Sequence, residues 1–132
     1  MKLFFDTNVL IAAFIAHGTC AELLEHCVAT HEVFICEFIL DEFTDKLLNK
    51  FHFTKADVDQ AGRLLSETLT CVQFAKPVEQ VCRDSDDDTV LAAAVAGGCD
   101  LLITGDKDLL TLQAYRGIRI VAPADFWHLE SD

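Results

Sequence analysis

The fold of this protein is decided by the stretch MKLFFDTN at residues 1–8. Its apolar run, from Leu3 to Phe5, ends in the polar sequence Asp-Thr-Asn. Such a run predicts a buried strand that stops at a polar turn. The residues that follow, 8–16, are apolar nearly all round, which is typical of a helix in the interior of a protein.

The same order of strand and helix is repeated along the rest of the chain. Strands are predicted at residues 1–5, 31–36, 70–75, 101–104 and 118–121, and helices at residues 8–16, 19–29, 37–49, 54–67, 85–96, 107–112 and 123–128. Capping-box patterns mark the helix starts near Thr19, Thr54 and Ser85. Strands that alternate with helices predict an α/β fold with a parallel sheet, here of about five strands, and helices on both of its faces.

The composition fits one domain with an unusual charge. The chain has 132 residues, of which 52% are hydrophobic, so it is not disordered and we expect a single domain over residues 1–132. It carries 22 acidic and 10 basic side chains, for a net charge of -12. Because phosphate contacts usually come from Lys and Arg, this balance argues against binding nucleic acid by bulk charge, unless the acids hold cations.

Neither the cysteines nor the histidines form a known metal motif. The six cysteines include no Cys-x-x-Cys pair, so we expect small buried side chains in a reducing compartment. The five histidines show no HxH or HExxH spacing, and we expect them at the surface or at the edge of the core. The longest apolar run, residues 9–16, is too short to span a membrane and no signal peptide is evident, so we expect a cytoplasmic protein with no membrane partner.

Acidic side chains lie next to the predicted strands at several points. They are Asp6 after the first strand, Glu42 in the helix after the second, Asp86, Asp87 and Asp88 at the start of the helix before the fourth, and Asp106 and Asp108 after the fourth. Open parallel sheets bind ligands at the carboxyl ends of their strands, so these carboxylates are expected to converge at one edge. Converging carboxylates repel one another, and a hard divalent cation such as Mg²⁺ removes that repulsion.

Each acid also has a purely structural interpretation. The acids after the first and fourth strands are placed to cap the helices that follow, and Glu42 lies on a charged helix face. Ser85 and Asp88 match the two ends of a capping box, which leaves Asp86 and Asp87 to the helix dipole. The metal hypothesis therefore depends on the joint placement of the acids, because no single one of them requires it.

Several stretches, taken in order, resemble a known family. They are FFDTNVL (4–10), ILDEF (39–43), RDSDDDTVLAAA (83–94), LITGDKDLL (102–110) and GIRIVAP (117–123). The chain resembles the PIN domain family, in particular its VapC-like group, which is described as the toxin component of toxin–antitoxin pairs. The resemblance covers essentially the whole chain and implies a three-layer α/β/α fold and a metal-dependent nuclease that acts mostly on RNA.

The resemblance also implies a set of site residues. Its four acids are Asp6, Glu42, Asp88 and Asp106, with Asp87 as the alternative to Asp88 and with Asp108 as a fifth acid. Asn8 and Thr104 match polar positions that often support the site. The chain departs from the family at Cys36-Glu37, where a Ser is common, and we expect a packing consequence there.

The function that follows is an endoribonuclease that uses Mg²⁺ or Mn²⁺. Asp6, Asp88 and Asp106 would hold the ions, with Glu42 assisting, and the cut would leave 5′-phosphate and 3′-hydroxyl ends. Lys46 and Lys50 share one helix face and are our candidates for contacting the RNA backbone, although an ordinary solvated face explains them too. An antitoxin protein and a homodimer are implied by the resemblance alone.

Two other functions agree less well with the sequence. An inactive PIN-like module that only binds a protein is disfavoured because all four acid positions are filled. A receiver domain phosphorylated on Asp is disfavoured because the third strand leads into Ala75-Lys76-Pro77, without an acceptor Asp, and the fifth leads into Ala122-Pro123, without a Lys.

Overall fold

The structure is a computed structural model that describes residues 1–16, 18–75 and 79–131. Its elements are β1 (Lys2–Phe5), α1 (Thr7–Ile15), α2 (Thr19–Thr30), β2 (Glu32–Cys36), α3 (Glu37–Asn49), α4 (Lys55–Thr68), β3 (Thr70–Val72), α5 (Ser85–Ala96), β4 (Leu101–Ile103), α6 (Lys107–Leu112), β5 (Ala114–Tyr115), β6 (Ile118–Val121) and α7 (Pro123–Ser131). The predicted order of strands and helices is confirmed. The predictions that concern His17, Lys76 and Pro77 lie outside the described residues.

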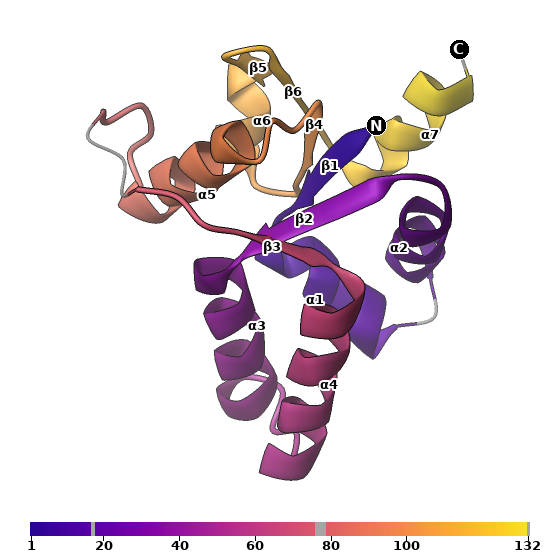
Figure 1. Cartoon of the computed structure of the whole chain (residues 1–132). Helices are drawn as coiled ribbons and strands as arrows, with labels where there is room; N and C mark the ends of the chain where they lie inside the picture. The colour runs from indigo at the N-terminus through magenta and orange to yellow at the C-terminus, as the bar shows by residue number, and fades with distance from the viewer. Residues whose placement is uncertain (17, 76–78, 132) are drawn as a thin grey trace.

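The sheet has the strand order β3-β2-β1-β4-β6-β5, and its neighbours are parallel except for the β5–β6 pair. The chain builds β1, β2 and β3 outward in one direction and then crosses to the other side of β1 for β4 and β6. The strand order therefore switches at β1 and β4, where a crevice forms at the carboxyl ends in folds of this kind. Figure 1 shows α1 to α4 on one side of the strands and α5 and α6 on the other, which confirms the α/β/α arrangement.

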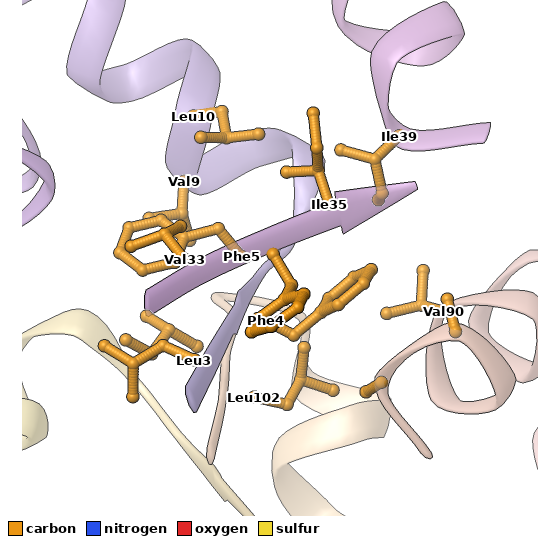
Figure 2. Packing of buried hydrophobic residues seen from close by; sticks show 14 of the residues in the cluster. Leu3, Phe4, Phe5, Val9, Leu10, Val33, Ile35, Ile39, Val90 and Leu102 are labelled. Carbon is orange, nitrogen blue, oxygen red and sulfur yellow. The ribbon is translucent and has the colours of Figure 1, made fainter. Parts of the chain in front are cut away.

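The core is built around β1. Leu3, Phe4 and Phe5 are completely buried, and because side chains alternate along a strand, Phe4 points to the layer opposite that of its two neighbours. Figure 2 shows Val9 and Leu10 of α1 packed on one side of β1 and β2, and Val90 of α5 on the other. Burying each large apolar side chain contributes about 1.5–3 kcal/mol, so the apolar run that predicted this strand also anchors both helix layers.

The structure differs from the prediction in several local details. β3 is shorter than predicted, and a two-residue strand, β5, was not predicted. Thr54 caps α4 as predicted, but α2 is capped by Gly18 without a side-chain bond, and Asp84 rather than Ser85 caps α5. At α5, the Asp84 carboxylate accepts a hydrogen bond from the Asp86 N–H and displaces the predicted cap by one residue.

Helix lengths and side-chain burial bear on the remaining predictions. No helix among the described residues is by itself long and apolar enough to cross a membrane; α1 and α2 pass that test only as a pair, bent by 108°. All six cysteines are free thiols; four are buried as expected, whereas Cys71 is exposed and Cys20 is half-buried. His52 and His128 are exposed, while His26 and His31 are half-buried.

Candidate metal centre

Asp6 and Asp106 come together because their strands are neighbours. β1 and β4 pair in parallel with Phe5 opposite Ile103, so the next residues leave the sheet at the same edge. The Asp6 N–H donates to the Ile103 carbonyl at 3.0 Å, which continues the ladder one residue past β1. The predicted convergence of the first and fourth strands is therefore a direct consequence of the strand order.

Thr104 joins these two acids. Its side chain is fully buried, and its Oγ1 donates to Asp6 Oδ2 at 2.7 Å and accepts from the Asp106 N–H at 3.0 Å. A buried hydroxyl that hydrogen-bonds to both residues fixes their positions relative to each other. The structure therefore places Thr104 where a supporting residue was predicted.

Both acids also act as helix caps. Asp6 Oδ1 accepts from the Thr7 N–H at the start of α1, at 2.8 Å. Asp106 Oδ1 accepts from the N–H groups of Asp108 and Leu109 at the start of α6, at 2.9 and 3.1 Å. The structural interpretation is thus correct for both residues. The cap of Asp106 uses Oδ1 and leaves Oδ2 to a metal ion, whereas Asp6 Oδ2 also accepts from the Thr104 hydroxyl.

Asp87, in the first turn of α5, completes an acidic cluster with Asp106 and Asp108 at the start of α6. Ligand oxygens of Asp87, Asp106 and Asp108 all lie within 4.8 Å of one another, a spacing at which one ion can contact all three. Burial, and then the charges of Asp106, Asp84, Asp6 and Asp108, raise the pKa of Asp87 to about 7. Three carboxylates held this closely store electrostatic repulsion that a divalent cation would relieve.

Asp6 shares this electrostatic environment. Burial raises the pKa of Asp6 above its ordinary value, and the charge of Asp106 raises it further. Hydrogen bonds from the Thr104 hydroxyl and the Thr7 N–H, together with the charge of Lys46, oppose that rise. Asp6 at the end of β1 and Asp87 in α5 therefore both have raised pKa values.

Asp88 has a different environment from its neighbour in sequence. It is buried, and its Oδ1 accepts from the N–H groups of Val81 and Cys82 at 3.0 and 2.8 Å. These bonds fix the loop that leads into α5. Between the two alternatives for the third acid, the structure brings Asp87 into the cluster and directs Asp88 to the backbone of this loop.

Glu42 approaches the site through a residue that sequence reasoning missed. The buried Thr7, the first residue of α1, donates its Oγ1 to Glu42 Oε1 at 2.7 Å. Glu42 is half-buried, so it is not a solvated charge of the α3 face. The polar sequence after β1 was the available signal, but Thr7 pairs with a residue 35 positions away that no local pattern indicates.

The cations have unequal positions around the site. Lys46 is half-buried, and its Nζ donates to Asn8 Oδ1 at 3.1 Å, so both predicted residues lie at the α1–α3 contact beside Asp6. Lys50 is exposed, with its Nζ 5.6 Å from the centre of the Phe51 ring. Arg83 donates to Asp108 Oδ1 at 2.8 Å and partly neutralises the cluster.

Taken together, the fold and this cluster define an α/β protein with a carboxylate site at the switch point of its sheet. The sequence model of the PIN domain matches residues 2–108, and the chain belongs to the PIN domain family. Members of this family are generally nucleases. No curated protein matches the chain.

The solved structures include a close counterpart of the fold. One chain of the crystal structure of VapBC2 from Rickettsia felis bound to a DNA fragment from their promoter superposes with a TM-score of 0.68. The match covers 92% of this chain and 98% of that chain, at 14% sequence identity. At this identity the likeness establishes the shared fold over nearly the full length of both chains.

Proposed function

We propose that residues 1–132 form a single nuclease domain, an endoribonuclease that depends on Mg²⁺ or Mn²⁺. The observation that carries this proposal is the cluster of Asp87, Asp106 and Asp108 beside Asp6 at the switch point. The donors are all carboxylate oxygens, which is the chemistry that Mg²⁺ and Mn²⁺ prefer. Family membership supports the same reaction class.

The residues divide into those that hold the ion and those that position others. Asp87 and Asp106 are the proposed ligands, and Asp108 and Asp6 are the other carboxylates around the ion. Asp88 holds the loop before α5 through its backbone hydrogen bonds. An ion bound there supplies Lewis-acid activation of water and stabilises charge on the departing oxygen. Glu42, oriented by the hydrogen bond from Thr7, is proposed to assist the metal or its water, and cleavage would leave 5′-phosphate and 3′-hydroxyl ends.

RNA is proposed to approach over the α1–α3 side of the cluster. Lys46, held by Asn8 beside Asp6, is the stronger candidate for a backbone contact, and the exposed Lys50 is the weaker one. With a net charge of -12, the protein has little bulk attraction for RNA. RNA affinity should therefore depend on the bound divalent ion more than on protein cations.

The partners of the similar structure suggest partners for this chain. That structure is described as VapBC2 bound to a promoter DNA fragment. By analogy we propose that an antitoxin covers the acidic cluster with an Arg-bearing segment, since Arg pairs well with carboxylates, and that the chain forms a homodimer. The free thiols agree with a cytoplasmic location.

The test is cleavage of RNA by the purified protein. With Mn²⁺ the protein should cut single-stranded or structured RNA, and EDTA should stop it. Asp6→Asn should remain folded but lose activity, whereas Asp125→Asn, at an exposed position on α7, should cut like the parent. Cleavage by Asp6→Asn at the parent's rate would remove Asp6 from the site. Mn²⁺ binding without any cleavage would favour the inactive protein-binding module.

A further inference from the structure

A second polar cluster lies at the opposite end of the sheet from the acids. It consists of His26 in α2, His31 between α2 and β2, and Glu130 in α7. Their ligand atoms all lie within 4.8 Å of one another. Figure 1 shows α7 and the start of β1 together at this end, with α5 and α6 toward the other end. Glu130 also lies outside the residues 2–108 that match the PIN domain, so the family does not account for this set.

Hydrogen bonding leaves part of the cluster unsatisfied. Glu130 Oε1 is 2.6 Å from His26 Nε2 and 3.4 Å from His31 Nε2, and only the first distance makes a hydrogen bond. No described residue provides a hydrogen-bond partner for His31 Nε2 or for Glu130 Oε2, and both atoms are buried. Buried polar atoms are nearly always paired, and a bound ion is one of the few explanations for such exceptions.

Both imidazole rings are held in place by their surroundings. The His26 ring lies 4.9 Å from the Trp127 ring, centre to centre, and the His31 ring lies 6.0 Å from the fully buried Phe126 ring. His31 Nδ1 is 3.1 Å from the Met1 amino nitrogen. His31 binds a metal through Nε2 only with its proton on Nδ1, donated to a polar acceptor. The uncharged Met1 amine can accept that proton, whereas its ammonium form would donate to Nδ1.

The donor set selects the kind of ion. Two imidazoles and one carboxylate are ligands of Zn²⁺ and related transition metals, and Mg²⁺ instead prefers oxygen donors. Around a four-coordinate Zn²⁺ with bonds of 2.0–2.1 Å, two ligand atoms lie about 3.3 Å apart. The observed distances of 2.6 and 3.4 Å lie on either side of this value, so small side-chain shifts would accommodate the ion.

We propose that His26, His31 and Glu130 bind a divalent transition-metal ion such as Zn²⁺, which fixes α7 to α2 and to the start of β2. Three protein ligands leave a fourth coordination position for water. The site is independent of the proposed nuclease centre, because it uses different donors at the other end of the sheet.

The experiment is a metal titration of the full chain after EDTA treatment and removal of the chelator. Excess Mg²⁺ is present throughout, so that the acidic cluster is occupied. Calorimetry with Zn²⁺ should give one bound equivalent. Titration with Co²⁺ should quench the fluorescence of Trp127, which is the sole tryptophan of the chain and packs against His26.

The variants locate the site. His31→Gln and Glu130→Gln should each weaken Zn²⁺ binding by more than about 100-fold, since even a lost second-shell partner costs about 10–100-fold. His128→Gln, at an exposed position on the same helix, is the matched control and should bind like the parent. Circular dichroism establishes that each variant is folded, and His26→Gln replaces any variant that is not.

Two results would overturn the proposal. One is a parent protein that takes up no Zn²⁺ in the presence of Mg²⁺. The other is folded His31→Gln or His26→Gln protein that binds Zn²⁺ as tightly as the parent, because the ion would then lie elsewhere. Loss of RNA cleavage in a separate assay would bear on the acidic cluster only.

Discussion

The two ends of the sheet carry polar clusters of opposite electrostatic character. At the carboxyl ends, burial and neighbouring carboxylates raise the pKa values of Asp6 and Asp87. At the amino ends, the hydrogen bond from His26, followed by the charges of the two histidines, lowers the pKa of Glu130 despite its partial burial. The first cluster repels itself without a cation, whereas in the second the histidines stabilise the carboxylate of Glu130.

This contrast shows how one sheet can carry two kinds of site. The acids meet because parallel strands bring their carboxyl ends to a common edge, and such a group is suited to a hard ion. The histidine cluster forms where α7 returns across α2, and it mixes nitrogen and oxygen donors suited to a softer ion. The two ends of the sheet therefore differ in the type of donor atom more than in the number of donors.

The largest effect is expected from the neighbouring acids of α5. Asp87→Asn should reduce Mn²⁺-dependent RNA cleavage by about 100-fold or more, because it removes a proposed ligand. Asp88→Asn should retain most activity, since an amide oxygen can still accept from the N–H groups of Val81 and Cys82. Single-turnover cleavage rates measure both. Greater loss of activity in Asp88→Asn than in Asp87→Asn would make Asp88 the ligand and would contradict the roles proposed for the two residues.

A smaller effect, on stability, is expected from two threonines at opposite ends. Thr104→Val should lower the free energy of unfolding by about 1–3 kcal/mol, because it leaves Asp6 Oδ2 and the Asp106 N–H without their buried partner. Thr30→Val, at an exposed position of α2, should cost less than about 0.5 kcal/mol. Urea unfolding in EDTA compares them. Equal losses would mean that the Thr104 bridge adds nothing beyond an ordinary surface contact.

The smallest effect is a pH-dependent shift in melting temperature. In the unfolded chain Asp87 titrates near its ordinary pKa, whereas in the folded protein its pKa is about 7. The folded state therefore keeps a proton that the unfolded state loses, and without metal its stability falls as the pH rises toward 7. At pH 8 in EDTA, Asp87→Asn should melt about 2–5 °C above the parent, and the difference should shrink near pH 4.

The pKa of Glu130 is shifted in the opposite direction from that of Asp87, so Glu130 serves as the control. Its lowered pKa contributes stability that is present at neutral pH and lost as the pH falls through the acid range. Glu130→Gln should therefore melt below the parent at pH 8, and thermal scans of both variants across pH measure the contrast. If both substitutions shift the melting temperature in the same direction at pH 8, the two ends do not differ electrostatically as described.

Much of the fold could be read from local patterns. The apolar run at β1, the polar turn after it and the alternation of elements were enough to place nearly all helices and strands. The predicted elements differ from the observed ones where a spatial neighbour or a single residue determines the local structure. Asp84 took the cap predicted for Ser85, and β5 exists only because Ala114 and Tyr115 pair with β6.

The candidate sites were predicted less evenly. Asp6, Thr104 and Asp106 were found because each directly follows a strand, and the order of the strands brings them together. Asp87 and Asp88 could not be separated, since adjacent helix residues point about 100° apart and the packing of α5 selects which one faces the cluster. The pairing of Arg83 with Asp108 and the meeting of Glu130 with His26 and His31 were not predicted, because these partners lie far apart in the chain and form no spaced motif.

The sequence by itself determined the order of the elements, the parallel sheet and the sheet edge at which the acids gather. Each of these follows from hydrophobic periodicity and from the rule that parallel strands end together. Only the tertiary structure decided that Asp87 joins Asp106, that Thr7 orients Glu42, and that Glu130 meets His26 and His31. The physical reason is that side-chain chemistry at a site depends on orientation across packed layers, which residues distant in sequence establish together.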